Sequence, residues 1–390
     1  MCVSRRALAL GSCYFWIMRL AKVVLVLLLW AIVFIGVSLP ASSDHVEIAS
    51  TAAPADYRMA PSLGELTSHK IDSFFDAVYR SGIFNGTYLF FRNDSLIKGA
   101  RGYSNFGARQ LAEPDDLFQL ASISKTFTGV SMMKMQQDGL LNIEDSVHWH
   151  LPDFKRRNLT LRHLLSHSSG LPDYFNLALP SGVSPSGHMH NEDVLRLLNA
   201  QSYRMFARPG YYDYCNSNYA LLALIIERKT GMDFRDYARE AIFKPAGMNY
   251  THICNFDSFP LVRYPVQGYN AGHVYGDLPH NGTTGDKGVY SNVYEMLLYD
   301  RALRSDLILH ADAKKAMFTP QVATSSEAHY GLGWRMRVIN GQKWVFHNGW
   351  WKGFRTYFWR SLEENKMFCV LTNNVRGSFL PTVEMVRLLD

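Results

Sequence analysis

The chain has 390 residues, of which 47% are hydrophobic and 13% aromatic, and this composition excludes a disordered or fibrous protein. The net charge is +6, but four basic residues lie in the first 41 positions, which leaves 36 basic against 34 acidic residues in the rest. A body so close to neutral lacks the basic stripe that binds a phosphate backbone, so nucleic acid is not an expected partner.

The first 41 residues predict export. Four basic residues precede an uncharged apolar run over 23–39, which ends near Ala41. This order is typical of a secretory signal peptide cleaved after Ala41. The run is also long enough to span a bilayer, so a retained membrane anchor is the alternative. Both interpretations predict a periplasmic or other extracytoplasmic protein, secreted or membrane-anchored, with an Ala-, Ser- and Pro-rich linker over 42–65.

From residue 66 the predicted strands fall into two groups, separated by a long helical segment. A helix is expected over 68–82, followed by strands over 86–92 and 95–103 that meet at Asn93-Asp94. The segment 116–315 is mostly helical.

Two of its helices have predicted ends. One follows Ser122 and ends at Gly139, and another runs from a capping Asn218 to Gly231. Strands return over 330–374, with Asn340-Gly341 as a hairpin turn.

This division of the strands predicts an α+β fold. If 84–103 and 330–374 form one antiparallel sheet flanked by helices, the segment 116–315 is a mainly helical insertion within a domain over 66–390. The chemistry is then expected between the sheet and the inserted helices.

Ser122 and Lys125 form a Ser-x-x-Lys pair at the start of a predicted helix. The spacing alone is weak, because Ser95/Lys98 and Ser131/Lys134 share it. At a helix start, however, Lys125 returns beside the Ser122 hydroxyl one turn later, and free N–H groups suit a developing oxyanion. The alternative is that Ser122 is a helix cap and Lys125 is solvated.

Two further motifs carry polar groups. Tyr214-Cys215-Asn216 precedes a long apolar helix, and a phenol near an ammonium can lose its proton well below a pKa of about 10, so Tyr214 is a candidate base. The amide of Asn216 can bind both a lysine and a substrate carbonyl. His347-Asn348-Gly349 ends a predicted strand whose edge can bind an extended substrate.

These motifs, in the order Ser122-x-x-Lys125, Tyr214-x-Asn216 and His347-x-Gly349, resemble those of the serine beta-lactamase and penicillin-binding-protein family. The similarity is to the branch of class C beta-lactamases, D-alanyl-D-alanine carboxypeptidases and related esterases. It extends to the flanking stretches 159–174, 208–231, 244–252 and 285–292, and covers about residues 66–390.

The resemblance implies a beta-lactamase/transpeptidase-like fold and an acyl-enzyme mechanism. Ser122 would be the nucleophile, with Lys125 and Tyr214 moving its proton. Asn216 would position Lys125 and the substrate, and the N–H groups of Ser122 and Trp350 would form the oxyanion hole. A small-molecule or peptide acyl donor is the expected partner.

Two departures limit the resemblance. His347 stands where class C beta-lactamases carry a lysine, and it is expected to be neutral at pH 7, which disfavours efficient beta-lactam hydrolysis. Trp350-Trp351 follow the third motif and would either narrow the cleft or provide an apolar shelf. Arg335, Arg337 and Arg355 are all candidates for a carboxylate anchor.

The sequence therefore predicts an exported serine hydrolase that acts on a D-amino-acid cell-wall-type peptide or a small carboxylic ester. No metal or cofactor is expected, because His163 and His167 lack the glutamate of a metalloprotease and the remaining cysteines lack metal spacing. The alternative is a catalytically weak, membrane-anchored sensor of peptidoglycan fragments or beta-lactams. The oligomeric state is left open.

Overall fold

The computed structural model describes residues 61–177, 187–202, 206–256, 266–375 and 379–390. These residues belong to one unit, Thr51–Asp390, and the predicted export segment over 1–41 lies outside them. Within the described ranges, no helix has both the length and the apolar character needed to cross a membrane.

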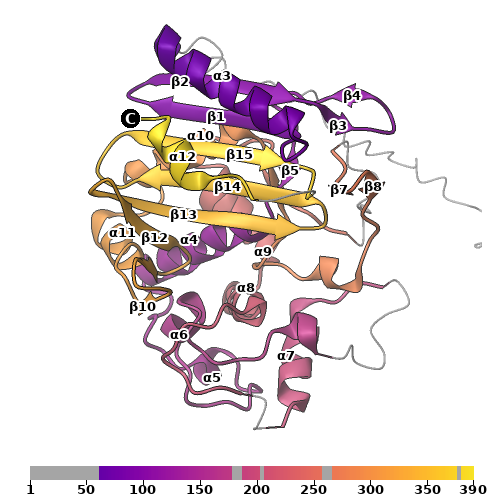
Figure 1. Ribbon diagram of the computed structural model, residues 1–390. Helices are drawn as coiled ribbons and strands as arrows, with labels where there is room; N and C mark the ends of the chain where they lie inside the picture. Colours follow the sequence, from indigo (N-terminus) through magenta and orange to yellow (C-terminus); the bar gives the residue numbers. More distant parts are fainter. Residues whose placement is uncertain (1–60, 178–186, 203–205, 257–265, 376–378) are drawn as a thin grey trace, which may run out of the picture. The chain divides into compact units, whose positions relative to one another are not determined.

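The main sheet is built from both ends of the described chain (Figure 1). Its neighbouring strands are all antiparallel, in the order β10-β11-β12-β13-β14-β15-β1-β2. Their bounds are β1 Gly86–Arg92, β2 Ser95–Arg101, β10 Val322–Ala323, β11 Ala328–Tyr330, β12 Arg335–Ile339, β13 Gln342–Trp351, β14 Phe354–Ser361 and β15 Lys366–Thr372. The pairing of β1 with β15 confirms the predicted antiparallel sheet of an α+β fold.

Both predicted hairpin turns have the backbone that their residues favour. Asn93 and Asp94 have φ of 47° and 66°, and Asn340 and Gly341 have φ of 50° and 76°. Two consecutive positive φ values define the type I′ turn, whose twist matches that of the strands it joins. These turns therefore set the registers of β1 with β2 and of β12 with β13.

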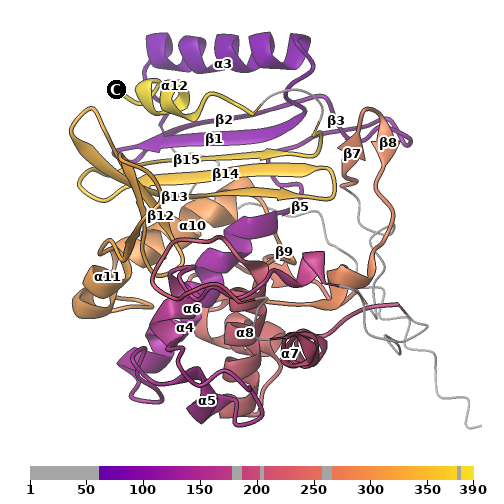
Figure 2. The ribbon, with the colours of Figure 1, turned by 60° about the horizontal axis from the view of Figure 1, so that its bottom comes forward.

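Side-chain alternation along the central strands divides the core into two layers. In β1, Tyr88 joins the cluster beneath α3 (Glu65–Arg80) and α12 (Thr382–Arg387), whereas Leu89 joins the larger cluster on the other face. Every residue of β15 is buried, as its continuously apolar sequence predicts for a central strand. Figure 2 shows α3 and α12 on one side of the sheet and α4, α8 and α10 on the other.

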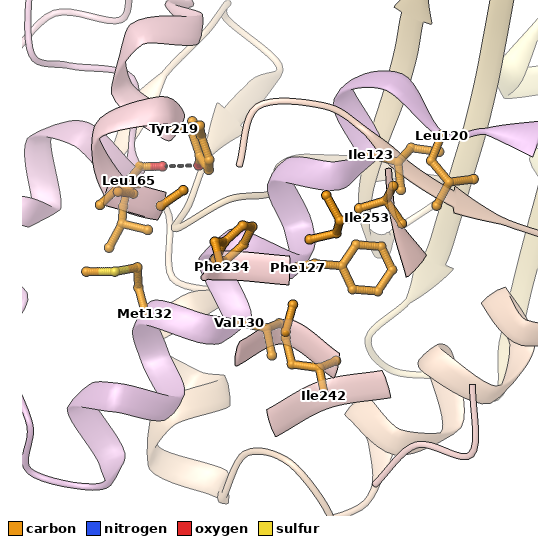
Figure 3. Close-up of a cluster of buried hydrophobic side chains, with 14 of the residues drawn as sticks. Leu120, Ile123, Phe127, Val130, Met132, Leu165, Tyr219, Phe234, Ile242 and Ile253 are labelled. Carbon is orange, nitrogen blue, oxygen red and sulfur yellow. Dashed lines mark hydrogen bonds between the residues drawn. The ribbon is translucent and has the colours of Figure 1, made fainter. Parts of the chain in front are cut away.

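The helical layer comes from the chain between β2 and β10. It contains α4 Ser124–Gln137, α5 Val147–His150, α6 Leu161–Leu165, α7 Asn191–Ala200, α8 Asn216–Thr230, α9 Phe234–Ala238, α10 Val293–Arg304 and α11 Ala311–Met317, with the shorter turns η1 Ala121–Ile123, η2 Tyr174–Asn176, η4 Arg239–Phe243 and η6 Pro279–Gly282. Nearly all of α4 is buried, so this helix lies in the middle of the core rather than on its surface. Side chains from several neighbouring elements surround it (Figure 3).

The prediction that Asn218 caps α8 is wrong. The helix begins two residues earlier, with Cys215 at its N-cap, because Asp173 from another part of the chain accepts a hydrogen bond from the Asn216 N–H at 2.8 Å. A carboxylate at this position also complements the positive end of the helix dipole. The predicted stop is confirmed, since Gly231 has φ of 71°.

A small sheet ties the start of α4 to a distant loop. Its strand order is β5-β9-β6, formed by Phe118–Gln119, Val289–Ser291 and His252–Ile253. The Leu120 N–H donates to the Val289 carbonyl, and the Val289 N–H donates to Ser124 Oγ. The chain on either side of Ser122 is therefore held against the first residue of β9. Two further pairs are β3 (Tyr103–Asn105) with β4 (Gln110–Leu111), and β7 (Tyr269–Asn270) with β8 (His273–Val274).

Candidate active site

A cavity of about 670 Å³ lies where the end of β13 meets the start of α4. Its lining comprises Ser122, Phe175, Tyr214, Asn216, Tyr275, Leu278, Asp286, Lys287, Arg335, Phe346, Asn348, Gly349, Trp350, Trp351, Lys352 and Phe379. The predicted site residues Ser122, Tyr214, Asn216, Gly349 and Trp350 thus share one cavity. Lys125 and His347 are buried and are not part of the lining.

Ser122 is the one residue between 117 and 133 that is not buried. It lies in η1, directly after Ala121, which has a left-handed φ of 51° although it is not a glycine. Such a backbone is unfavourable for alanine and persists only where the surrounding structure enforces it. The result is that one hydroxyl from an otherwise buried segment reaches the cavity.

Lys125 is not the solvated lysine of the alternative interpretation, because its amine is fully buried. All of its hydrogen bonds go to neutral oxygens. Lys125 Nζ donates to Ser122 Oγ at 3.2 Å, to Asn216 Oδ1 at 2.7 Å and to the Asp286 carbonyl at 2.8 Å. Burial lowers the pKa of Lys125 from 10.5 to about 8, because the charged form loses its hydration; Arg335 also lowers it, whereas Asp286 and Asp173 oppose the shift.

Asn216 is held in one orientation by Asp173. The Asn216 Nδ2 donates to Asp173 Oδ2 at 2.7 Å, so its Oδ1 faces Lys125. Asp173 lies directly before η2, in a stretch whose sequence gives no sign of a contact with residue 216. Sequence reasoning missed this carboxylate.

The expectation that Tyr214 has a lowered pKa is wrong. Its ring lies 5.0 Å from Lys125 Nζ and 4.2 Å from the His167 ring, in a poorly solvated environment. Burial raises the pKa of the phenol above its usual 10, and the opposing effects of a hydrogen bond with Ser122 and of the Arg335 charge do not reverse the shift. Tyr214 is therefore a protonated hydroxyl at neutral pH.

His347 is neutral and is held behind the cavity wall. Its Nδ1 lies 2.8 Å from the carbonyl of Asn348, which can only accept, so Nδ1 carries the proton and Nε2 accepts from the Tyr330 hydroxyl at 3.1 Å. Burial holds the pKa of His347 well below its usual 6.5. The third motif therefore brings no cation to the cavity.

Gly349 allows β13 to approach the chain that carries Ser122. A Cβ at this position would lie 2.3 Å from the Leu120 carbonyl oxygen and 2.2 Å from Thr356 Oγ1. The missing side chain of Gly349 therefore lets β13 lie close to the segment before η1. The roles of the Ser122 and Trp350 N–H groups in an oxyanion hole remain predictions.

Aromatic side chains form a further part of the cavity lining. The indole of Trp351 stacks on Phe175 with ring centroids 4.9 Å apart, and its Nε1 donates to Asn281 Oδ1 at 3.1 Å. Trp350 is 60% exposed and meets Phe379 edge to face. Asn281 belongs to the other His-Asn-Gly stretch, which forms η6 and supports Trp351.

The three candidate arginines have different positions. The Arg335 guanidinium lies over Tyr214, 5.3 Å from its ring centroid, and lines the cavity. Arg337 pairs with Glu327 away from the cavity, and Arg355 packs over Phe379. Arg335 is therefore the arginine whose charge is placed beside the Ser122 cluster.

Comparisons with known proteins identify relatives of this chain. The Beta-lactamase family matches residues 73–385. A penicillin-binding protein of Bacillus subtilis (strain 168) is 31% identical over 324 residues, which cover 78% of this chain and 71% of that protein. A D-aminopeptidase of Cereibacter sphaeroides is 29% identical over 281 residues, 70% of this chain, so the match spans about half (54%) of that relative's length.

Solved structures show the same fold. A penicillin-binding protein from Bacillus halodurans superposes with a TM-score of 0.70 at 25% identity, covering 80% of this chain and 97% of that one. The D-amino acid amidase of Ochrobactrum anthropi SV3 superposes with a TM-score of 0.71 at 21% identity, over 83% of this chain and 97% of that one. At that identity the second similarity concerns the fold alone.

Proposed function

The chain belongs to the Beta-lactamase family of serine hydrolases, and we propose that it cleaves an ester or amide acyl donor through an acyl-enzyme on Ser122. The observation that carries the proposal is the contact of a buried amine with the one accessible hydroxyl of η1: Lys125 Nζ lies 3.2 Å from Ser122 Oγ. The preferred donor is a D-amino-acid peptide of cell-wall type or a small carboxylic ester.

The geometry supports a two-step reaction. Neutral Lys125 takes the proton of Ser122 Oγ as the oxygen attacks the substrate carbonyl, and the N–H groups of Ser122 and Trp350 hold the resulting oxyanion. Tyr214, protonated and beside both groups, passes its proton to the departing alcohol or amine and is reprotonated by Lys125. Water then attacks the ester and gives a proton through Tyr214 to Lys125. Lys125 returns that proton to Ser122 Oγ as the acid is released, so both groups end in their starting states.

Arg335 is the proposed anchor for a substrate carboxylate, because it supplies the cation that His347 does not. Replacing Arg335 by methionine is expected to lower kcat/KM about 10- to 100-fold for a donor with a free carboxylate, the range of a lost charge-assisted hydrogen bond. The matched methyl ester should lose much less.

The ratio between the two substrates is the readout, because Arg335 also packs on Tyr214 and its loss affects both donors. Arg337→Met is the control, since Arg337 pairs with Glu327 outside the cavity. An equal loss for both substrates in Arg335→Met would contradict an anchoring role.

Replacing Gly349 by alanine is expected to push β13 away from the segment that carries Ser122. The added Cβ meets the backbone oxygen of Leu120, which cannot rotate away. We expect a loss of roughly 10²- to 10³-fold in kcat, as for a lost oxyanion donor, and a lower free energy of unfolding by about 1–3 kcal/mol.

Steady-state kinetics and denaturant unfolding test this prediction. Gly107→Ala is the matched control, because a Cβ there meets only Asn105 Oδ1 at an ordinary 3.4 Å. Unchanged kinetics in Gly349→Ala would show that β13 does not set the geometry around Ser122.

The substrate class rests on the site and on the relatives together. The D-aminopeptidase relatives support a D-amino-acid donor, and the stacked Trp351 and Phe175 offer an apolar surface for its side chain. The neutral His347 argues against efficient beta-lactam turnover. Export through the leader over 1–41 is part of the proposal, since peptidoglycan substrates lie outside the cytoplasm.

A substrate panel tests the proposed function. The purified protein is given D- and L-amino acid amides, a D-alanyl-D-alanine peptide, p-nitrophenyl esters and a chromogenic beta-lactam, each with a Ser122→Ala control. We expect turnover of a D-configured amide or an ester to exceed that of the beta-lactam. Saturable binding of these compounds without turnover would instead support the sensor function.

A further inference from the structure

Two lysines are buried side by side at the candidate active site, and Asp286 lies between them. Its backbone carbonyl accepts from Lys125 Nζ at 2.8 Å, whereas its carboxylate lies 3.3 Å from Lys287 Nζ. All three residues are at most 3% exposed. Nothing in the predicted motifs pointed to Lys287, and the proposed acyl transfer does not use it directly.

The two amines have different partners. Each hydrogen bond of Lys125 goes to a neutral oxygen, whereas Lys287 is paired with a carboxylate and also donates to the hydroxyls of Tyr174 and Thr283. A buried ammonium needs a counter-ion close by, and a buried neutral amine does not. The carboxylate therefore favours the charged form of Lys287, whereas a charge on Lys125 acts in the opposite direction and lowers the pKa of Lys287.

Asp286 and Lys287 are also fixed in place on the wall of the cavity. Tyr174 Oη donates to Asp286 Oδ2 at 2.9 Å. Lys287 Nζ lies 5.2 Å from the Phe175 ring and 5.5 Å from the Trp351 ring, so its charge is also stabilised by two aromatic faces. The ion pair is thus a rigid part of the site.

Other titratable and charged groups also face Lys125. They come from the α6–η2 segment, from the chain around the start of α8, and from β12 and β13: His167, Asp173, Tyr214, Cys215, Tyr219, Arg335 and His347. Burial lowers the pKa of both histidines, so they are neutral. Burial also raises the pKa of the two phenols and of the thiol, so these three groups are uncharged as well. The charged neighbours are therefore Asp173, Asp286, Lys287 and Arg335.

We propose that the Asp286–Lys287 pair positions Lys125: the Asp286 carbonyl holds the amine beside Ser122, and the fixed charge of Lys287 favours the neutral form of that amine. The inference rests on the proposed role of Lys125 as the base for Ser122. Burial lowers the pKa of each lysine to about 8, which is compatible with one of them being neutral in part of the population near neutral pH.

The sign of the effect follows from charge. Without the Lys287 cation, the Asp286 carboxylate keeps its bond from Tyr174 but has lost its counter-ion, so it favours a proton on Lys125. Reaction at Ser122 requires neutral Lys125, so the pH at which reactivity rises to half its plateau should move upward, by about one unit for one neighbouring charge.

The test is the pH dependence of Ser122 modification by a fluorophosphonate, measured between pH 5 and pH 10 as the second-order rate and located by peptide mass. We expect Lys287→Met and Lys287→Gln to shift the midpoint upward by about one unit, with roughly a tenfold slower reaction at pH 7. Lys287→Arg, which keeps the charge, should restore the parent midpoint. Lys134→Met is the control, because Lys134 pairs with Asp138 and is not part of the cavity lining.

The outcomes separate the two proposals. An unmodified Ser122 in the parent protein at every pH would overturn the proposed function itself. Modification with the same midpoint in the parent and in both neutral Lys287 variants would leave the proposed function standing and overturn this inference. Melting temperatures identify a variant that does not fold. If Lys287→Met does not fold, Lys287→Gln is used for the comparison with the parent.

Discussion

Replacing Ser122 by alanine is expected to reduce turnover of every substrate by about 10⁴- to 10⁶-fold, the range seen when a nucleophile is removed from a serine hydrolase. The Ser122 hydroxyl is the one accessible oxygen in the segment from 117 to 133, and Lys125 donates to it. No other hydroxyl in the described part of the chain combines a place in the cavity lining with a hydrogen bond from Lys125; the other two acceptors, Asn216 Oδ1 and the Asp286 carbonyl, are not nucleophiles.

The fold should survive this change, because the substitution removes one oxygen from a side chain that is only partly buried. Ser131→Ala is the matched control: Ser131 has the same spacing to Lys134, but it is buried within α4 and is not part of the cavity lining. Steady-state rates and melting temperatures of both variants check the prediction. Turnover by Ser122→Ala at more than a hundredth of the parent rate would exclude Ser122 as the nucleophile.

Replacing Lys125 by methionine is expected to lower kcat/KM about 10³- to 10⁴-fold, near the upper limit for loss of a general base. About a tenth of the molecules carry a neutral Lys125 at pH 7 when its pKa is about 8, so the base is present at a useful level without any external activation. Methionine fills a similar volume but cannot accept the proton of Ser122.

Stability should change much less than activity in Lys125→Met. The amine of Lys125 is fully buried and pairs with neutral oxygens, so its removal relieves a desolvation cost while leaving Asn216 Oδ1 and the Asp286 carbonyl without that donor. Kinetics together with denaturant unfolding separate the two effects. A fall in activity that simply follows a fall in the folded fraction would contradict a catalytic role for this lysine.

Short-range signals predicted much of the fold. Two consecutive turn residues at Asn93-Asp94 and at Asn340-Gly341 have positive φ, and the continuously apolar β15 lies in the middle of the sheet. These features depend on neighbours in the sequence, so periodicity and turn chemistry are sufficient to find them.

Features that depend on distant residues were not predictable in the same way. Asp173, 43 positions away in the sequence, accepts a hydrogen bond from the first residue of α8. The helix therefore begins at Asn216 and not at the predicted Asn218. The ion pair of Asp286 and Lys287 meets Lys125 across 161 positions. These residues lie in the stretches 159–174 and 285–292, which share the family resemblance, but only the fold brings them beside Asn216 and Lys125, so the local sequence does not reveal these contacts.

The prediction of a lowered pKa for Tyr214 was wrong for a related reason. The sequence places a phenol and a lysine in one site, and an ammonium would stabilise a phenolate. Burial is not visible in the sequence, and here it lowers the pKa of Lys125 while raising that of Tyr214. The proton therefore stays on the phenol, and the amine becomes the better base.

The central claim is that an acyl group passes through Ser122, and intact-protein mass after millisecond mixing with p-nitrophenyl acetate and an acid quench tests it most directly. The account predicts an added acetyl group in the parent protein, located by peptide mass on Ser122, and none in Ser122→Ala. Release of p-nitrophenol at the parent rate by Ser122→Ala, or an acetyl group on a different residue of the parent, would contradict it.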